Sequence, residues 1–249
     1  MRFLLLGHFE IHQPDGTLLA VTRIKHRQLL ALLLLDSPHA VSTDRCIAAL
    51  WGEDSPPSAR RNLQTYVAEL RKGLACSGVS IETVPGGYRV TDVADRLDLS
   101  AFEAMRSGAA MALSARDDAV VVQMLRDALD LWRGSALQDL ADSSEALRNA
   151  ATQLNERRLA SVSDFAGGCI RLGAYEEAID QLRIAVTLAP LREDLRAQLM
   201  VALHRSGRRA DALLAYHECR SALVERIGVG PSQTLTSLHN RILMEDRSL

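Results

Sequence analysis

The side chains best suited to chemistry stand together in PPSARRNLQTYVAELRK, residues 56–72. Guanidinium groups bind phosphates or bridge two acceptors of guanine, and a glutamine amide pairs with adenine. At 3.6 residues per turn the apolar residues share one side of a helix, namely Ala59, Leu63, Val67, Leu70 and Leu74. The opposite side carries Arg61, Thr65, Ala68 and Lys72. This pattern predicts a helix that anchors one face in a core and turns a basic face outward.

The start of this helix is also signalled. Pro56 and Pro57 suit a first helical turn, and we expect Ser55 to be the N-cap. Taken alone, the stretch is still more typical of an ordinary solvated surface helix. The next segment changes that balance, because residues 81–90 hold two short β-prone runs around Pro85-Gly86-Gly87 and predict a hairpin. A basic helix followed by a tight hairpin is the pattern of a winged helix-turn-helix.

Two further helices are predicted before it. Residues 25–35 form an apolar run rich in leucine, and residues 42–51 form a second run with Ser42 or Thr43 as N-cap and Gly52 as its end. The chain therefore offers three helices and a wing in the order that this fold requires.

The runs RFLLLGHFEI, KHRQLLALLLL, IAALWGEDSPPSARRNLQTYVAELRKGL and VPGGYRV resemble the DNA-binding domain of the SARP family, the Streptomyces antibiotic regulatory proteins. The resemblance implies an OmpR-like winged helix preceded by a small β-sheet. Residues 2–7, 9–12 and 17–21 are short and apolar enough to supply its strands. Local variants such as Cys46 leave the motifs intact.

The second half, from Leu97 onward, predicts helices throughout. An internal match at a period of 34 pairs Gly173 with Gly207 and Ala178 with Ala212, which is typical of tetratricopeptide (TPR) repeats. The runs LDLSAFEAM, TLAPLREDLRAQLMVALHRSGRRADALLAY and IGVGPSQTL resemble the bacterial transcriptional activator domain of SARP proteins. The predicted fold is mostly α with a small β component. We expect a winged helix-turn-helix domain over 1–93 and an all-α, TPR-like domain over 94–249.

Composition narrows the class of protein. The net charge is -2, and division after Val93 leaves +1 and -3, so basic character is confined to the helix of residues 56–72. Four widely spaced cysteines, with no C-x-x-C, favour reduced and mostly buried thiols. No signal peptide or membrane-spanning run is present, which favours a cytoplasmic location. Without a phosphate loop, an H-E-x-x-H or a G-x-S-x-G motif, we expect no enzyme, cofactor or metal, and no fused ATPase. We also expect no receiver domain ahead of Arg2.

The winged-helix interpretation assigns roles to single residues. A recognition helix turns its N-terminal half to base edges, so we expect base readout from Arg60, Arg61, Gln64 and Thr65. Near the other end, Arg71 and Lys72 are candidates for phosphate clamps, and Arg89 on the wing for the backbone or minor groove. Further candidates lie on the flanks. They are Asn62, which we expect to contact DNA, Tyr66, which we expect to pack, and Lys25 and Arg27 as secondary phosphate contacts.

The family resemblance implies two kinds of partner. The first is promoter DNA with direct repeats, bound by protomers side by side as a dimer. The second is RNA polymerase, contacted by the loop of Gly52, Glu53, Asp54 and Ser55. The two acids equally fit a simpler role, because they favour the positive end of the following helix. The implied function is activation of a secondary-metabolite gene cluster. The alternative is a helical-repeat scaffold whose winged helix binds protein instead of DNA.

Overall fold

The structure is a computed structural model that describes residues 1–19, 21–75 and 78–246. Its helices are α1 (Ile24–Leu35), α2 (Thr43–Trp51), α3 (Ala59–Leu74), α4 (Asp98–Ser114), α5 (Asp118–Leu129), α6 (Glu145–Leu172), α7 (Tyr175–Leu188), α8 (Glu193–Arg205), α9 (Arg209–Ile227) and α10 (Gln233–Leu243). Short 3-10 turns lie at Ala94–Arg96 and Ala141–Ser143. The chain divides into two compact units. Unit 1 comprises residues 1–105 and 130–157, and unit 2 comprises 106–129 and 158–249.

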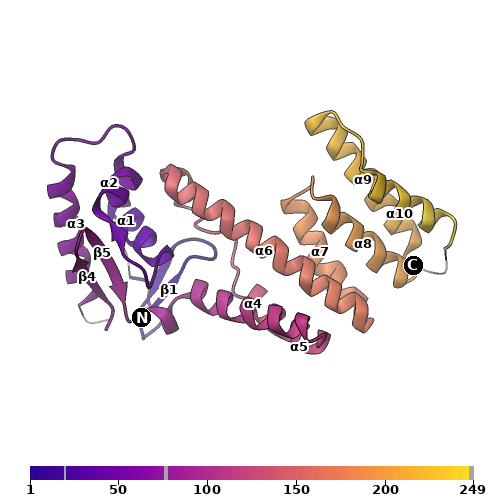
Figure 1. The fold of residues 1–249 in the computed structure, drawn as a ribbon, viewed down its shortest axis with the longest axis horizontal. Coiled ribbons are helices and arrows are strands. Elements are labelled where there is room, and N and C mark those ends of the chain that lie inside the picture. Colours follow the sequence, from indigo (N-terminus) through magenta and orange to yellow (C-terminus); the bar gives the residue numbers. More distant parts are fainter. Residues whose placement is uncertain (20, 76–77, 247–249) are drawn as a thin grey trace. The chain divides into compact units, whose positions relative to one another are not determined.

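The helices of the winged helix-turn-helix lie in unit 1 (Figure 1). Helices α1, α2 and α3 contact one another, and α1 lies at their centre because its residues 29–34 are all buried. The expected cap of α2 is confirmed, since the Ser42 hydroxyl accepts a hydrogen bond of 3.1 Å from the Arg45 amide. The helix ends as expected at Gly52, where φ is +61°.

The wing is the hairpin of β4 (Ser80–Val84) and β5 (Gly87–Thr91), as expected, with Pro85 and Gly86 in its turn. Gly86 has φ of +80°, which suits glycine. The antiparallel sheet has the order β3-β5-β4, in which β3 is Val41–Ser42. Gly87 is needed here because a Cβ would lie 2.1 Å from the Val41 carbonyl oxygen. The wing is therefore packed closely onto the strand that leads into α2.

The N-terminal sheet is smaller than expected. Strands β1 (Arg2–Leu4) and β2 (Glu10–His12) pair antiparallel. The prediction of a third strand over residues 17–21 is wrong for its described residues, where Leu18 forms only an isolated bridge with His12, and Ala20 lies outside the described residues. Leu18 is 61% exposed, so the apolar residues of this segment do not alternate into a core as they do in a half-buried strand.

Residues from the second half of the chain complete unit 1. The buried carboxylate of Asp98 accepts hydrogen bonds from the amides of Leu5 (2.8 Å) and Leu6 (3.0 Å), just after β1. The carbonyls of Leu5 and Leu6 accept from the amides of Leu137 (2.9 Å) and Arg133 (2.8 Å). The winged helix thus shares its N-terminal strand layer with α4 and with residues 130–157.

Unit 2 is helical, as expected, and shows the predicted 34-residue repeat. Gly173 and Gly207 have φ of +79° and +82°, and each precedes a helix that begins at Tyr175 or Arg209. Helix α8 packs against both α7 and α9. The matched small residues are buried in one continuous core, which includes Ala178, Ile179, Leu182, Leu199, Ala212 and Tyr216. This arrangement confirms the TPR-like fold class.

The state of the cysteines and the absence of a membrane-spanning helix are both expectations from composition, and the described residues can be compared with them. Cys46, Cys169 and Cys219 are free and buried, as expected, while Cys76 lies outside the described part of the chain. Burial raises the pKa of the Cys46 thiol to about 12 and that of Cys169 to about 11. No described helix has both the length and the apolar composition needed to cross a bilayer.

Candidate nucleic-acid interface

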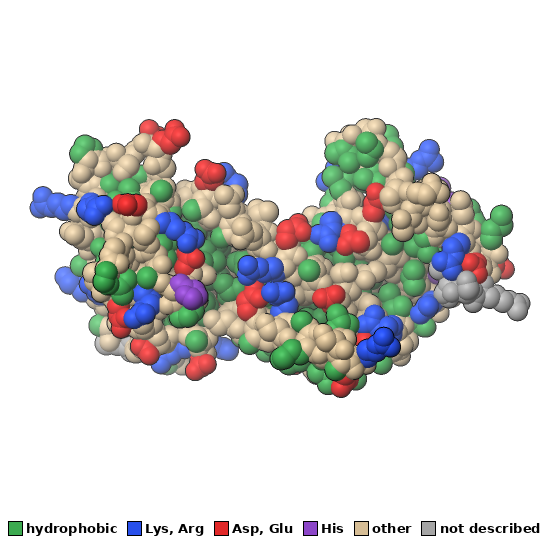
Figure 2. Space-filling view, in the orientation of Figure 1, with side chains coloured by type: hydrophobic (Ala, Val, Ile, Leu, Met, Phe, Trp, Pro, Cys, Tyr) green, Lys and Arg blue, Asp and Glu red, His purple; other side chains and the backbone are tan. Residues whose placement is uncertain are grey.

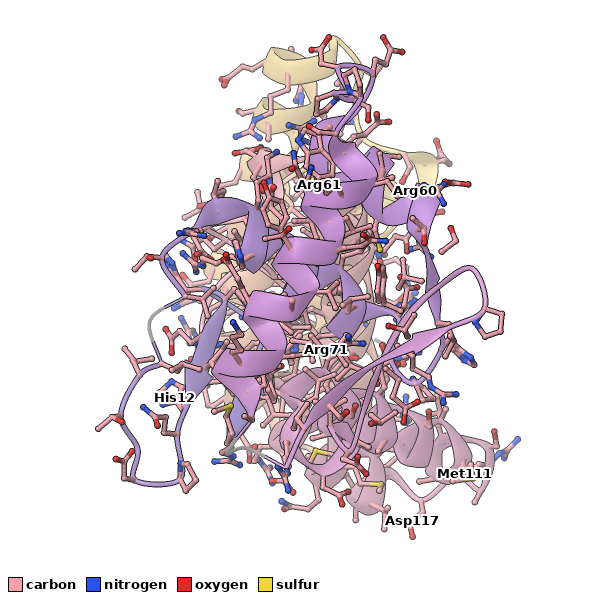
Figure 3. The ribbon with its side chains drawn as sticks, turned by 90° about the vertical axis from the view of Figure 1, so that its left-hand side faces the viewer. His12, Arg60, Arg61, Arg71, Met111 and Asp117 are labelled. Atoms are coloured by element: carbon pink, nitrogen blue, oxygen red, sulfur yellow. The ribbon has the colours of Figure 1, made fainter. Side chains whose placement is uncertain are left out.

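Helix α3 has the two faces that its sequence predicts. Its core face consists of side chains that are at most 5% exposed, namely Ala59, Leu63, Val67, Leu70 and Leu74. Its outer face consists of exposed residues, namely Arg60, Arg61, Gln64, Thr65, Ala68, Arg71 and Lys72. Figure 3 shows Arg60 and Arg61 near one end of this helix and Arg71 farther along it, beside the hairpin. The apolar face fixes the helix on α1 and α2, so the polar side chains are held in one orientation.

The helix begins later than predicted. It starts at Ala59 with Ser58 as N-cap, so the assignment of Ser55 as N-cap and of Pro56 and Pro57 to the first turn is wrong. The physical reason is the proline pair, because a residue that precedes a proline is disfavoured in the α region. Ser55 and Pro56 both precede a proline and remain outside the helix. The basic residues at 60 and 61 therefore occupy its very first turn.

The residues expected to read bases lie in the first two turns of α3. Arg60 pairs with Asp44 of α2 at 3.0 Å, and both side chains are largely exposed, so the pair is weak and its guanidinium can exchange partners. The side chains of Arg61 and Gln64 make no hydrogen bond or ion pair within the described part of the chain. The Thr65 hydroxyl donates to the Arg61 carbonyl at 3.2 Å and keeps its lone pairs for another donor.

Asn62 lies differently from these residues. It is only partly exposed, and its amide donates to the Ser58 hydroxyl at 3.2 Å, across the start of the helix. A side chain held in this way stabilises the N-terminus of α3. Its expected contact with DNA stays a prediction.

Arg71 connects α3 to the wing, and Arg89 connects the two strands of the wing. Arg71 Nε donates to the Ile81 carbonyl at 2.7 Å and Nη2 donates to Thr83 Oγ1 at 2.8 Å. Arg89 pairs with Glu82 at 2.6 Å, directly across the hairpin. Sequence reasoning missed Glu82, although the register set by a two-residue turn places it opposite Arg89. It also missed Asp44, for which the sequence holds no local signal.

Lys72 is the second cation expected at a phosphate. Its side chain is exposed, and the ammonium group has no hydrogen bond or ion pair to any residue that the structure describes. Figure 2 shows Lys and Arg side chains along the outer edge of the winged helix, where α3 lies in Figure 1. The cationic surface is therefore local, as the near-neutral charge of residues 1–93 requires.

The flanking candidates are engaged within the protein. Tyr66 packs, as expected, between His26 at 4.7 Å and Trp51 at 6.0 Å between ring centroids. Lys25 donates to the Leu50 carbonyl, and burial lowers its pKa. Arg27 donates to the Phe9 carbonyl at 2.9 Å and pairs with an aspartate. The two cations brace unit 1, so neither is a good phosphate contact.

The loop between α2 and α3 projects from the winged helix (Figure 1). Gly52, Glu53, Asp54 and Ser55 are all exposed. Because α3 begins only at Ala59, both acids lie well before its first turn, whereas the attraction of a helix N-terminus for negative charge falls off within a turn. The simpler explanation for these acids is therefore weakened.

Comparison with known proteins agrees with this architecture. Residues 19–90 match the family described as "Transcriptional regulatory protein, C terminal", and residues 97–243 match the "Bacterial transcriptional activator domain". The chain is 36% identical to the regulatory protein AfsR of Streptomyces coelicolor over its whole length, but it spans only 25% of that protein. It is 32% identical to the regulatory protein DnrI of Streptomyces peucetius, with 99% of this chain and 93% of DnrI covered.

A solved structure is also similar. Mycobacterium tuberculosis EmbR, determined in complex with a low-affinity phosphopeptide, is 33% identical, with a TM-score of 0.86 over 98% of this chain and 65% of that one. The named relatives are regulators, and two successive family matches cover most of the sequence. This chain therefore belongs to the SARP family of transcriptional regulators, with a winged helix followed by a bacterial transcriptional activator domain.

Proposed function

We propose that this regulator is a sequence-specific DNA-binding transcriptional activator. In this proposal α3 enters the major groove, with Arg60, Arg61, Gln64 and Thr65 at base edges and Lys72 at a phosphate. Arg89 of the wing reaches the adjacent backbone or minor groove, and Asn62 stands at the flank. The protein works in the cytoplasm, where the promoter DNA is.

The observation that carries this proposal is the outer face of α3. Its first two turns present two guanidinium groups, an amide and a hydroxyl, and no large apolar side chain lies among them. A surface made for a protein partner would be expected to hold an apolar or aromatic anchor at its centre. Arginine and glutamine at the start of a rigid helix instead match the acceptors and donors of the major groove.

The test is a binding measurement on promoter DNA that carries a direct repeat. Each bidentate base contact contributes about 1–3 kcal/mol of discrimination, so Arg61→Ala or Gln64→Ala should weaken specific binding about 5- to 150-fold. Arg220→Ala is the matched control, because Arg220 is an exposed arginine of α9 in unit 2. This control should bind like the wild type. Footprinting on the same DNA then locates the repeat.

Two outcomes would contradict the proposal. If the wild-type protein shifts no promoter fragment at low salt, the winged helix does not bind DNA, and the protein-binding scaffold becomes the better account. If Arg61→Ala loses affinity equally for specific and random DNA, Arg61 is a phosphate contact and sequence is read elsewhere. The phosphopeptide in the EmbR structure is a ligand of EmbR. For this chain a phosphopeptide is only a probe, whose binding would be measured to test the alternative of a protein-binding scaffold.

The same proposal assigns the Gly52–Ser55 loop to RNA polymerase. It rests on the exposure of the loop and on two acids that no described side chain neutralises. The double variant Glu53→Lys, Asp54→Lys should reduce transcription in vitro while promoter affinity is retained. An equal loss of promoter affinity would refute this role.

The proposal also covers assembly and target genes. Two protomers would lie side by side on direct repeats as a dimer. The family resemblance supports a secondary-metabolite gene cluster as the target.

A further inference from the structure

We propose that Arg71 is a positioning residue that sets the place of the wing relative to α3, and not a phosphate clamp. This inference rests on the proposed DNA-binding function, since the wing matters only if both elements meet one duplex. It changes the assignment of a cation that sequence alone places at the DNA backbone.

The geometry of the guanidinium carries the argument. Nε and Nη2 form one edge of the planar group, and both are used, by the Ile81 carbonyl at 2.7 Å and by Thr83 Oγ1 at 2.8 Å. A side-on, bidentate contact with a phosphate would need that same edge. Binding a phosphate in this way would therefore release β4 from α3. Figure 3 shows Arg71 on the half of α3 that faces the hairpin.

The place of β4 in the sheet explains why such a contact is needed. The order is β3-β5-β4, so β4 is an edge strand with a neighbour on one side only. Backbone groups of an edge strand lack strand partners, and a side chain that covers the edge can supply them. Arg71 supplies a donor to the Ile81 carbonyl and a second contact two residues farther along the same strand.

The wing is also held at its tip. The Thr43 amide, at the start of α2, donates to the Gly86 carbonyl at 2.8 Å. Strand β3 pairs with Gly87 and Tyr88 of β5. Contacts at the tip and the base thus fix the hairpin to α2 and α3 before any DNA is present. A surface organised in advance loses less entropy on binding.

The neighbouring residue provides a control within the same turn of helix. The Lys72 ammonium is exposed and has no partner among the described residues, so it is free to neutralise a phosphate. A phosphate contact releases counterions, which makes binding depend on salt with a slope of about 0.9 per contact. A positioning residue changes affinity without changing that slope.

The experiment measures specific DNA affinity against salt concentration for Arg71→Lys, Arg71→Ala, Thr83→Val and Lys72→Ala. We expect Arg71→Lys to bind about tenfold more weakly despite its retained charge, because one ammonium cannot replace the fork of a guanidinium. Its salt slope, and that of Arg71→Ala, should equal the wild-type slope. Thr83→Val should weaken binding less, and Lys72→Ala should reduce the slope by about 0.9.

Amide exchange of β4 and β5 is measured in parallel, without DNA. It should accelerate in Arg71→Lys while α1 stays protected, which separates a loosened wing from a misfolded protein. Wild-type affinity in Arg71→Lys, a reduced salt slope in Arg71→Ala, or unchanged exchange of the hairpin would each overturn the inference. If the wild-type protein binds no DNA, the proposed function fails, whereas the exchange measurement still decides whether Arg71 holds the wing.

Discussion

The contact between Asp98 and the N-terminal strand layer leads to the most specific stability prediction. Asp98 is the first residue of α4, and it is only 8% exposed. Its two oxygens accept from the amides of Leu5, Leu6 and Leu99 at 2.8 to 3.0 Å. We predict that Asp98→Ala destabilises unit 1, because it leaves the amides of Leu5 and Leu6, more than 90 residues earlier in the chain, without an acceptor.

The magnitude follows from the contacts. A hydrogen bond to a charged group contributes about 1.5–3 kcal/mol, so the loss of those from Leu5 and Leu6 costs about 3–6 kcal/mol. Part of this cost is recovered, because burial of the carboxylate is itself unfavourable and raises the pKa of Asp98. We therefore expect a net loss of about 3 kcal/mol. Asp98→Asn should cost nearly as much, since its NH2 group would face an amide donor.

Hydrogen exchange is the suitable assay, because two compact units need not unfold together. The amides of β1 and α1 should exchange about 100-fold faster in Asp98→Ala, since each 1.4 kcal/mol corresponds to a factor of ten. Buried helices of unit 2 that do not continue into unit 1, such as α8, should be unaffected. Asp95→Ala removes an exposed acid three residues earlier and should stay within about 0.5 kcal/mol of the wild type. A loss below about 1 kcal/mol in Asp98→Ala, or equal acceleration in α8, would refute the reasoning.

Three further predictions concern single positions. Gly87→Ala should lower the free energy of unfolding, measured by thermal denaturation, by more than about 2 kcal/mol, because the new Cβ would meet the Val41 carbonyl. Gly86→Ala, at φ of +80° with open space around it, should cost only about 1 kcal/mol. Equal losses in the two variants would contradict this. Ser42→Ala should cost about 1 kcal/mol in urea unfolding as the loss of an N-cap, while Ser55→Ala should be neutral. In a Cys76→Ser variant at pH 8, Ellman's reagent should label none of the remaining cysteines until denaturant is added. The reason is that burial raises the pKa of Cys46 to about 12 and that of Cys169 to about 11. Labelling of the native protein within minutes would count against their burial.

Periodicity made the faces of the helices predictable. Leu63, Val67 and Leu70 recur at helical spacing, and the structure buries all three under the exposed arginines of α3. Gly173 and Gly207 were recognisable as equivalent because small residues in one repeat reappear 34 positions later in the next. The wing could be found from its turn, since a proline followed by two glycines has few other uses between β-prone runs. Each of these signals is contained in the element or the helix pair whose residues it places.

Boundaries and partners were less predictable. The pair Pro56-Pro57 suits a first turn, but it also restricts the residue before each proline, and the second effect decides where α3 begins. The segment of residues 17–21 is apolar, yet Leu18 is 61% exposed and forms one isolated bridge with His12. Whether Arg60 and Arg89 are paired depends on Asp44 and Glu82, whose positions follow from the packing of α2 on α3 and from strand register.

The division of the chain into compact units shows the same limit at a larger scale. Composition changes after Val93, where β-prone segments give way to helices, and this change predicts a domain boundary. Hydrogen bonds link the two sides of that position, since Asp98 binds the amides of Leu5 and Leu6, and the Arg133 amide binds a carbonyl beside them. A sequence pattern records which residues are apolar, but it does not record which distant carboxylate satisfies a buried amide. A winged helix cut off after residue 93 would expose those amides, so its stability depends on residues that the family pattern assigns to the following domain.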